Sequence, residues 1–167
     1  MSSPFVAILM GSESDLPVMQ GASDVLSGLG VRCEMKITSA HRTPAATQQY
    51  ISDAESRGCA LFIAGAGLAA HLAGAVAAHT LKPVIGVPID SGPMQGMDSL
   101  LSTVQMPAGI PVATVAIGKT GAKNAGYLAA QILALQDAAL AQRVRAEREQ
   151  KAASVQAQDR ALQESRK

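Results

Sequence analysis

The stretch Ser39–Pro44, with the sequence SAHRTP, combines side chains suited to proton transfer and anion binding. An imidazole such as that of His41 exchanges a proton near neutral pH. The guanidinium of Arg42 keeps its charge, and its planar fork suits a phosphate or a carboxylate. Thr43-Pro44 has the pattern of a helix N-cap followed by proline at the first helical position. We therefore expect a strand-to-helix turn with a proton carrier beside an anion clamp. The alternative is an ordinary loop histidine next to a solvated arginine.

A second polar stretch, Gly11–Asp15, lies between an apolar run and a helical pattern. The free N–H groups and positive dipole end of a helix start favour an anion. Ser12 and Ser14 add hydroxyl donors, and the Asp15 carboxylate could accept hydrogen bonds from sugar hydroxyls. The alternative is that Ser14 or Asp15 only caps the helix. The stretch matches neither the GxGxxG fingerprint nor a Walker P-loop, so NAD and ATP are not indicated.

A third stretch, Gly65–His71, would let the backbone approach a ligand closely, although small residues here could equally serve tight helix–strand packing. His71 is either a site residue or a structural histidine, and we expect His79 to be structural. The histidines lack carboxylates at metal-ligand spacing, so we predict no metal site. Cys33 and Cys59 fall within expected strands rather than in loops, which leaves proton transfer by histidine as the favoured chemistry.

Short apolar runs alternate with helical patterns along the chain, which predicts a parallel sheet with helices on both faces. Strands are expected over residues 5–10, 31–37, 59–64, 83–87 and 112–117, and helices over 16–29, 44–57, 68–79, 98–104 and from about 124 past 140. The second strand alternates charged and apolar residues, as at a sheet edge. The predicted fold is a three-layer αβα, doubly wound sheet of about five strands. The three polar stretches then share its carboxyl edge, where such sheets bind ligands.

Composition narrows the class of ligand. The net charge is +1 and aromatic residues make up only 2% of the chain, so neither a basic footprint nor a stacking platform for nucleic acid is present. The apolar run at residues 5–10 is too short for a membrane span and has no basic leader before it. The two cysteines form no CxxC motif. We expect a cytoplasmic protein that contacts neither nucleic acid nor membrane and binds a small phosphorylated molecule.

Charge is distributed unevenly. The chain has 14 Lys and Arg and 13 Asp and Glu, and 12 of these 27 residues lie between Asp137 and Lys167. A body so poor in charge is typical of a homo-oligomer, because interface cores are depleted in charged residues. We expect one domain over residues 1–150 and a charged, frayed tail over 151–167.

Five stretches together resemble the PurE family of purine biosynthesis, and more narrowly its bacterial class. The resemblance runs in unbroken order from Val6 to about Leu140 and does not cover the tail. The stretches are Met10–Asp15, Ser39–Pro44, Gly65–Leu72, Asp98–Pro107 and Gly109–Gly118.

The resemblance implies a flavodoxin-like fold and interconversion of N5-carboxyaminoimidazole ribonucleotide with 4-carboxy-5-aminoimidazole ribonucleotide, without metal or cofactor. It implies that His41 is the general acid and base and that Ser12, Asp15 and Arg42 bind the ribose phosphate. Ser14, Ser39 and the segment from Gly67 to His71 would line the aminoimidazole and carboxylate pocket. It also implies an octamer with shared sites and a C-terminal helix that extends to neighbouring subunits.

Two alternatives remain at this point. The sister class carboxylates aminoimidazole ribonucleotide directly, and the stretch Ala69–Leu72 follows the mutase pattern instead. A non-enzymatic flavodoxin-like module would need aromatic residues around a flavin or an acidic cluster for phosphorylation. The sequence has few aromatics, and Gly11-Ser12 and Gly65 stand where a receiver would place its acids.

Overall fold

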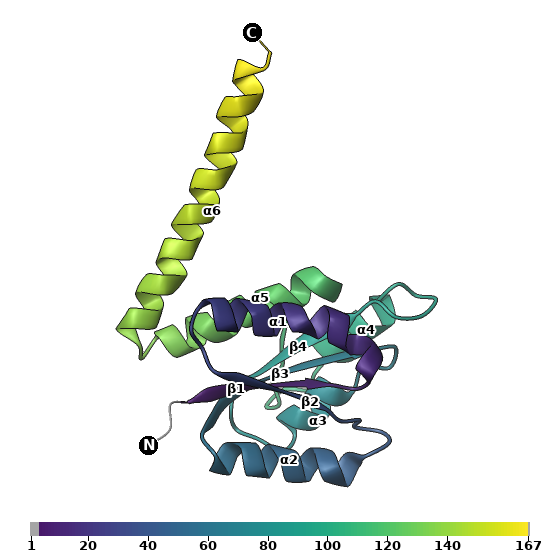
Figure 1. Cartoon of the computed structure of the whole chain (residues 1–167). Coiled ribbons are helices and arrows are strands. Elements are labelled where there is room, and N and C mark those ends of the chain that lie inside the picture. Colours follow the sequence, from purple (N-terminus) through teal and green to yellow (C-terminus); the bar gives the residue numbers. More distant parts are fainter. Residues whose placement is uncertain (1–3, 167) are drawn as a thin grey trace.

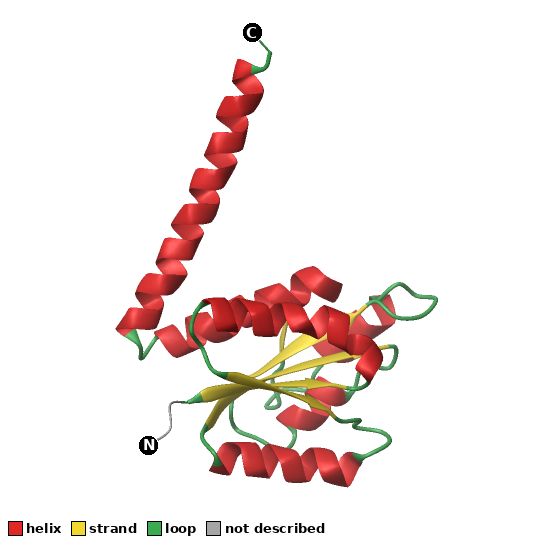
Figure 2. Cartoon of the chain, in the orientation of Figure 1, coloured by secondary structure: helices red, strands yellow, loops and turns green. Residues whose placement is uncertain are grey.

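A five-stranded parallel sheet forms the centre of the molecule in the computed structural model, which describes residues 4–166 (Figure 1, Figure 2). The strand order is β2-β1-β3-β4-β5, and all four pairings are parallel. The strands are β1 (Phe5–Met10), β2 (Cys33–Ile37), β3 (Cys59–Gly67), β4 (Val84–Ile89) and β5 (Ala113–Thr114). The helices are η1 (Glu13–Asp15), α1 (Leu16–Gly28), α2 (Pro44–Ser56), α3 (Leu72–Ala77), α4 (Met97–Val104), α5 (Gly118–Ala134) and α6 (Ala138–Glu164). The doubly wound fold is confirmed, and β2 is an edge strand as its alternating pattern predicted.

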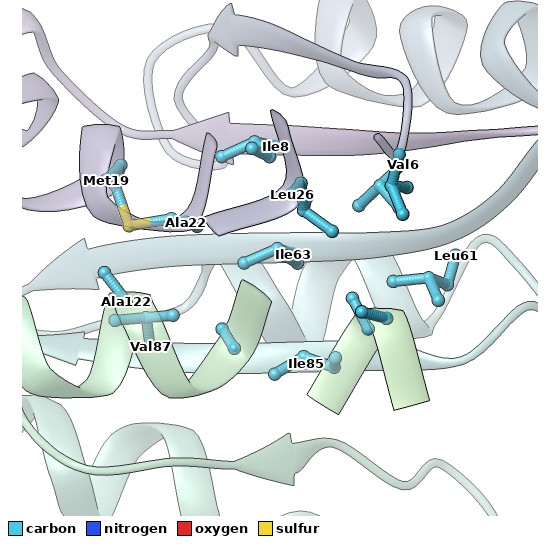
Figure 3. Close-up of a cluster of buried hydrophobic side chains, with 14 of the residues drawn as sticks. Val6, Ile8, Met19, Ala22, Leu26, Leu61, Ile63, Ile85, Val87 and Ala122 are labelled. Carbon is cyan, nitrogen blue, oxygen red and sulfur yellow. The ribbon is translucent and has the colours of Figure 1, made fainter. Parts of the chain in front are cut away.

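Strand β1 is buried on both faces because its side chains alternate between two apolar clusters. The first cluster joins the sheet to α1 and α5, and Figure 3 shows part of it. The second cluster joins the sheet to α2 and α3. From β1, the first receives Val6, Ile8 and Met10, and the second receives Phe5, Ala7 and Leu9. A strand packed on both faces has a fixed register, so the position of the chain after Met10 is fixed too.

Helix α1 packs directly on the end of β3. A Cβ added to Gly65 would lie 2.3 Å from the sulfur of Met19, which is fully buried. The missing side chain of Gly65 leaves the space that Met19 fills. The loop before α1 is therefore held beside the strand that leads to Gly67.

An ion-pair network covers the exposed edge of the sheet. Arg57, at the end of α2, donates to both carboxylate oxygens of Glu34 on β2 at 2.6 and 2.8 Å, and to Asp53 at 2.7 Å. The Tyr50 hydroxyl donates to Glu34 at 2.6 Å, and the Arg57 guanidinium lies 5.2 Å from the ring centre of Phe5. The hydrogen bonds from Arg57 lower the pKa of Glu34 to about 2. The network joins α2 to the edge strand β2, the two elements that the Ser39–Pro44 stretch connects.

The helical tail differs from the prediction in two respects. A single helix was expected from about residue 124 past Leu140, but α5 ends at Ala134 and α6 begins at Ala138. The extended backbone of Asp137 makes the break, and its carboxylate caps α6 by accepting from the Leu140 N–H at 2.9 Å. The tail expected to fray instead continues α6 as far as Glu164. It is rich in Ala and Gln, which are strong helix formers, and has no Gly or Pro.

Helix α6 projects from the body after its first turns (Figure 1). Leu140 is buried, and the Arg143 Nε–H donates to the Leu29 carbonyl at 2.8 Å. The hydroxyl of Tyr127 on α5 hydrogen-bonds to both Glu147 and Lys151. Beyond these contacts the described tail residues are exposed.

Other boundaries move as well, among them the start of α5, which is Gly118 instead of about residue 124. Strand β3 runs to Gly67 instead of ending at Ala64, and β5 shrinks to Ala113–Thr114. Helix α3 begins only at Leu72, because Leu68 has a positive φ of 54° that a helix cannot contain. Within residues 4–166 there is no helix with the length and apolarity to cross a membrane.

We expect E34Q to lower the free energy of unfolding by about 1 kcal/mol at pH 7, since both partners of this ion pair are partly solvent-screened. The contribution of Glu34 is fully present above the ordinary glutamate pKa of 4.5 and is lost as the pH falls through about 2. Urea unfolding at pH 7 and near pH 2 measures both effects, with E149Q, an exposed glutamate on α6, as the control. The same difference in unfolding free energy between E34Q and the parent at both pH values would contradict this account.

Candidate active site

A cavity of about 540 Å³ opens where β1, β2 and β3 end, lined by the loops that follow them. Parallel pairing sets Met10 beside Ile37 on one side and beside Gly65 on the other, so these loops are neighbours. Every site residue expected from the sequence lines this cavity: Ser12, Ser14, Asp15, Ser39, His41, Arg42, Gly67 and His71. Leu68 lines the cavity too, as expected for the segment from Gly67 to His71, and the structure adds Ser91, which the sequence did not indicate.

The first loop is closed by a reciprocal capping box. The Ser12 hydroxyl accepts from the Ser14 N–H at 3.4 Å, and the Asp15 carboxylate accepts from the Ser12 N–H at 3.1 Å. Ser12, rather than Ser14 or Asp15, therefore caps η1. Burial raises the pKa of the Asp15 carboxyl, while the N–H groups of Ser12 and Gly11 and the charge of Arg42 oppose that shift. Asp15 is thus both a structural group and a potential acceptor at the cavity.

The second loop is tied to the first by Arg42. Its Nη2 donates to the Gly11 carbonyl at 3.2 Å, and its backbone N–H donates to the Ser39 hydroxyl at 3.1 Å. Thr43 occupies the predicted N-cap position of α2 with Pro44 at the start of the helix. Its hydroxyl makes no capping bond, however, and instead donates to the Ser39 carbonyl at 3.1 Å. The Arg42 guanidinium is therefore held at the cavity by the Gly11 carbonyl, although Arg42 remains exposed to solvent.

The two histidines meet across the cavity. His41 Nε2 lies 3.2 Å from His71 Nδ1, and the ring centres are 5.2 Å apart. One nitrogen of this contact must carry a proton and the other a lone pair. Two imidazolium rings could not make it, because both facing nitrogens would then carry protons. The structure thus resolves the ambiguity of His71 in favour of a place in the cavity.

The third loop requires glycine at position 67. A Cβ there would lie 1.7 Å from the hydroxyl oxygen of Ser91, which follows β4 and reaches the cavity because β4 pairs with β3. Leu68, which follows directly, has a positive φ of 54° and is half exposed over the cavity. A leucine in this conformation costs about 1 kcal/mol or more. The loop is therefore a non-helical strap between β3 and α3.

A larger hollow of about 880 Å³ lies at the opposite edge, around His79–Val84 and Gly109–Pro111. Its carboxylate, Glu55, is already hydrogen-bonded to Thr80, and the His79 ring contacts the Ala75 carbonyl at 2.8 Å. The smaller cavity instead gathers two imidazoles, a guanidinium and four serines from separate loops. Proton transfer on a small anionic ligand is the chemistry that this set suits. Within residues 4–166 there is no cluster of three or more potential metal ligands.

The family model described as AIR carboxylase matches residues 5–154. The chain belongs to this family. N5-carboxyaminoimidazole ribonucleotide mutase of Vibrio parahaemolyticus is 53% identical over 150 residues, which cover 90% of this chain and 93% of that protein. The mutase of Bacillus subtilis is 56% identical over 146 residues, covering 87% and 90%.

A solved structure agrees with the AIR carboxylase assignment. PurE of Treponema denticola superposes with a TM-score of 0.88 at 32% identity, covering 96% of this chain and 99% of that one. The resemblance to the PurE family drawn from five stretches of sequence is thereby confirmed, as is the doubly wound fold.

We expect G67A to destabilise this AIR carboxylase family member by about 1–3 kcal/mol, because the new methyl group overlaps the Ser91 hydroxyl. S91A alone is expected to be mild, and the G67A/S91A double variant should recover part of the loss. G28A is the control, since a Cβ at Gly28 meets nothing within 4 Å. Thermal unfolding of the four variants measures the coupling, and strictly additive effects would contradict the contact.

Proposed function

We propose that this chain is an N5-carboxyaminoimidazole ribonucleotide mutase of purine biosynthesis. The observation that carries the proposal is the identity of more than half the residues, over about 90% of the chain, with proteins of that name. The cavity supports it, because it holds proton carriers and an anion clamp. We include in the proposal a cytoplasmic location and a reaction without metal or organic cofactor.

In this proposal the ribose phosphate binds where the first two loops meet. Arg42 supplies a fixed positive charge, and Ser12 and Asp15 offer a donor and an acceptor to phosphate and ribose oxygens. Ser14, Ser39, Gly67 and His71 surround the aminoimidazole and its carboxylate. The strap from Gly67 to His71 brings the backbone close to the flat ring, since the strap begins with a residue that has no side chain.

His41 acts as general acid and then as general base. It gives a proton to the exocyclic N5 of the carbamate, the N5–C bond breaks, and CO2 leaves an amino group behind. Carbon 4 of the imidazole attacks CO2 with a ring electron pair, forming the new C–C bond. His41 then removes the C4 proton, which restores the aromatic ring and returns the histidine to its starting state. The neighbouring His71 ring, 3.2 Å away, can hydrogen-bond to the His41 imidazole before the first step and after the second, when His41 carries the proton.

Recapture of CO2 is efficient only if the gas stays in place, because confinement turns the second step into an intramolecular one. His41, His71 and Leu68 are exposed in a single chain. These residues must therefore be shielded from water by the bound substrate and by a neighbouring copy of the chain. The proposed mechanism thus depends on assembly.

The test is a stopped assay with N5-carboxyaminoimidazole ribonucleotide, without ATP and with a metal chelator present. We expect the 4-carboxy isomer to form. A parallel reaction receives aminoimidazole ribonucleotide and bicarbonate, the substrates of the sister carboxylase. Faster product formation in that second reaction would reject the mutase in favour of the carboxylase, and no product in either would reject both.

We expect H41N to keep substrate binding and to lose turnover by roughly two to four orders of magnitude, the usual value of one general acid–base group. H79N is the matched control, because His79 is an exposed histidine that contacts the Ala75 carbonyl away from the cavity. Steady-state kinetics with an independent binding measurement separates the two effects. Turnover of H41N near that of H79N would remove His41 from the mechanism.

We propose that the assembly is an octamer with active sites shared between subunits. An apolar stripe on α4 supports an interface, since Met97 and Leu101 are each 50% exposed and Val104 is 45% exposed. Their spacing of four and three residues puts them on one helix face. The charge-poor body supports the same conclusion, and the projecting α6 is long enough to reach a neighbouring copy.

We expect L101E to shift the protein to smaller assemblies, because a carboxylate would have to be buried at the interface. Light scattering coupled to gel filtration measures the mass of the parent, of L101E and of the control Q48E. Gln48 lies exposed on α2 and receives the same added charge. An unchanged octamer for L101E would exclude the α4 stripe from the interface.

A further inference from the structure

Three threonine hydroxyls lie one after another at the base of the loop that carries His41 and Arg42. The Oγ1 atoms of Thr38 and Thr47 are 2.7 Å apart, and both residues are buried, at 5% and 3% exposure. Thr47 Oγ1 is also 3.1 Å from the Thr43 carbonyl. Thr38 directly follows the last residue of β2, and Thr47 lies on α2. The hydroxyls therefore connect the two elements on either side of the loop.

The directions of these hydrogen bonds follow from the fact that each hydroxyl has one proton. Thr47 donates to the Thr43 carbonyl, so it must accept from Thr38. Thr43 donates to the Ser39 carbonyl at 3.1 Å and accepts from the Ser39 N–H at 3.0 Å. With these directions all three protons have acceptors, and the 3.5 Å separation of the Thr38 and Thr43 hydroxyls needs no bond. The chain of donors is complete without water.

The same bonds close the loop at its neck. Thr43 contacts the Ser39 carbonyl through both its N–H, at 2.9 Å, and its hydroxyl. The Thr38 N–H donates to the Met10 carbonyl at 2.9 Å, which fixes the other side of the base to the end of β1. His41 and Arg42 are themselves exposed, so little packing holds them. Hydrogen bonds hold them instead, namely the contacts of Arg42 with Gly11 and Ser39, the contact of His41 with His71, and the closed neck of the loop.

We infer that Thr47 is a positioning residue for the proposed reaction, acting on His41 and Arg42 through Thr38 and Thr43. Thr47 is absent from the cavity lining and contacts no reacting group. Without its hydroxyl, the buried Thr38 proton loses its acceptor, and the nearest hydroxyl oxygen is that of Thr43, 3.5 Å away. Unpaired buried donors are costly, so Thr43 is drawn toward Thr38 and its bonds to Ser39 weaken. This inference rests on the proposed function, and its test includes a measurement that does not.

The decisive comparison is T47V with T103V. Thr103 is equally buried, at 2% exposure, and its hydroxyl donates to the carbonyl four residues earlier at 2.7 Å, as that of Thr47 does. It lies on α4, outside the cavity lining. The two variants remove the same group from the same local backbone geometry, and T47V should lose somewhat more stability because it also leaves the Thr38 hydroxyl without its acceptor. Because small displacements of reacting groups have large kinetic effects, we expect kcat to fall about tenfold in T47V and to stay within about twofold in T103V.

T47S should restore kcat, since it keeps the hydroxyl, and T38V should be milder than T47V because Thr47 then keeps its carbonyl acceptor. Amide hydrogen exchange of the peptide spanning residues 38–47, in the intact protein, is expected to rise in T47V and not in T103V. The exchange comparison does not depend on mutase turnover. If the parent shows no turnover, the proposed function is rejected, and the exchange rates alone then test whether Thr47 positions the loop. Equal kcat in T47V and T103V, or unchanged exchange in T47V, would overturn the inference.

Discussion

The position of β1 between β2 and β3 is the constraint on which the site depends. Both pairings are parallel, so three chain segments leave the sheet at one edge within a few residues of one another. The two-sided burial of β1 fixes its register, and a slip by one residue would turn each apolar side chain toward the wrong cluster. The same packing that stabilises the core therefore delivers the proton carrier, the guanidinium and the serines to one cavity.

Polar contacts, rather than packing, organise the cavity itself. The Asp15 carboxylate closes the capping box that Ser12 begins and is attracted by the charge of Arg42, and Arg42 in turn joins the second loop to the first through the Gly11 carbonyl. In the proposed function each group serves both structure and ligand binding, which suits a protein with 2% aromatic residues. Such a site can recognise a small nucleotide without a stacking platform, since charges and backbone groups supply the contacts.

The fold and most of the cavity lining were accessible from sequence because they depend on local patterns. Apolar runs and helix starts predicted four of the five strands closely, and the carboxyl-edge rule gathered His41, Arg42 and Ser12 correctly. Ser91 was missed because its place depends on the pairing of β4 with β3, which no local pattern specifies. The break before α6 had a local signal, namely the aspartate at 137 three residues before Leu140. The contact between His41 and His71 is tertiary, and no spacing along the chain encodes it.

Helix α6 starts at the amino edge of the sheet, near Pro4, Ala60 and Lys82, whereas the cavity opens at the carboxyl edge. Its 27 residues span about 40 Å. Anything joined to that end, whether a fused protein or an immobilising support, is carried away from the entrance for small molecules. Within one chain α6 is therefore a spacer between an attached group and the cavity that holds the histidines.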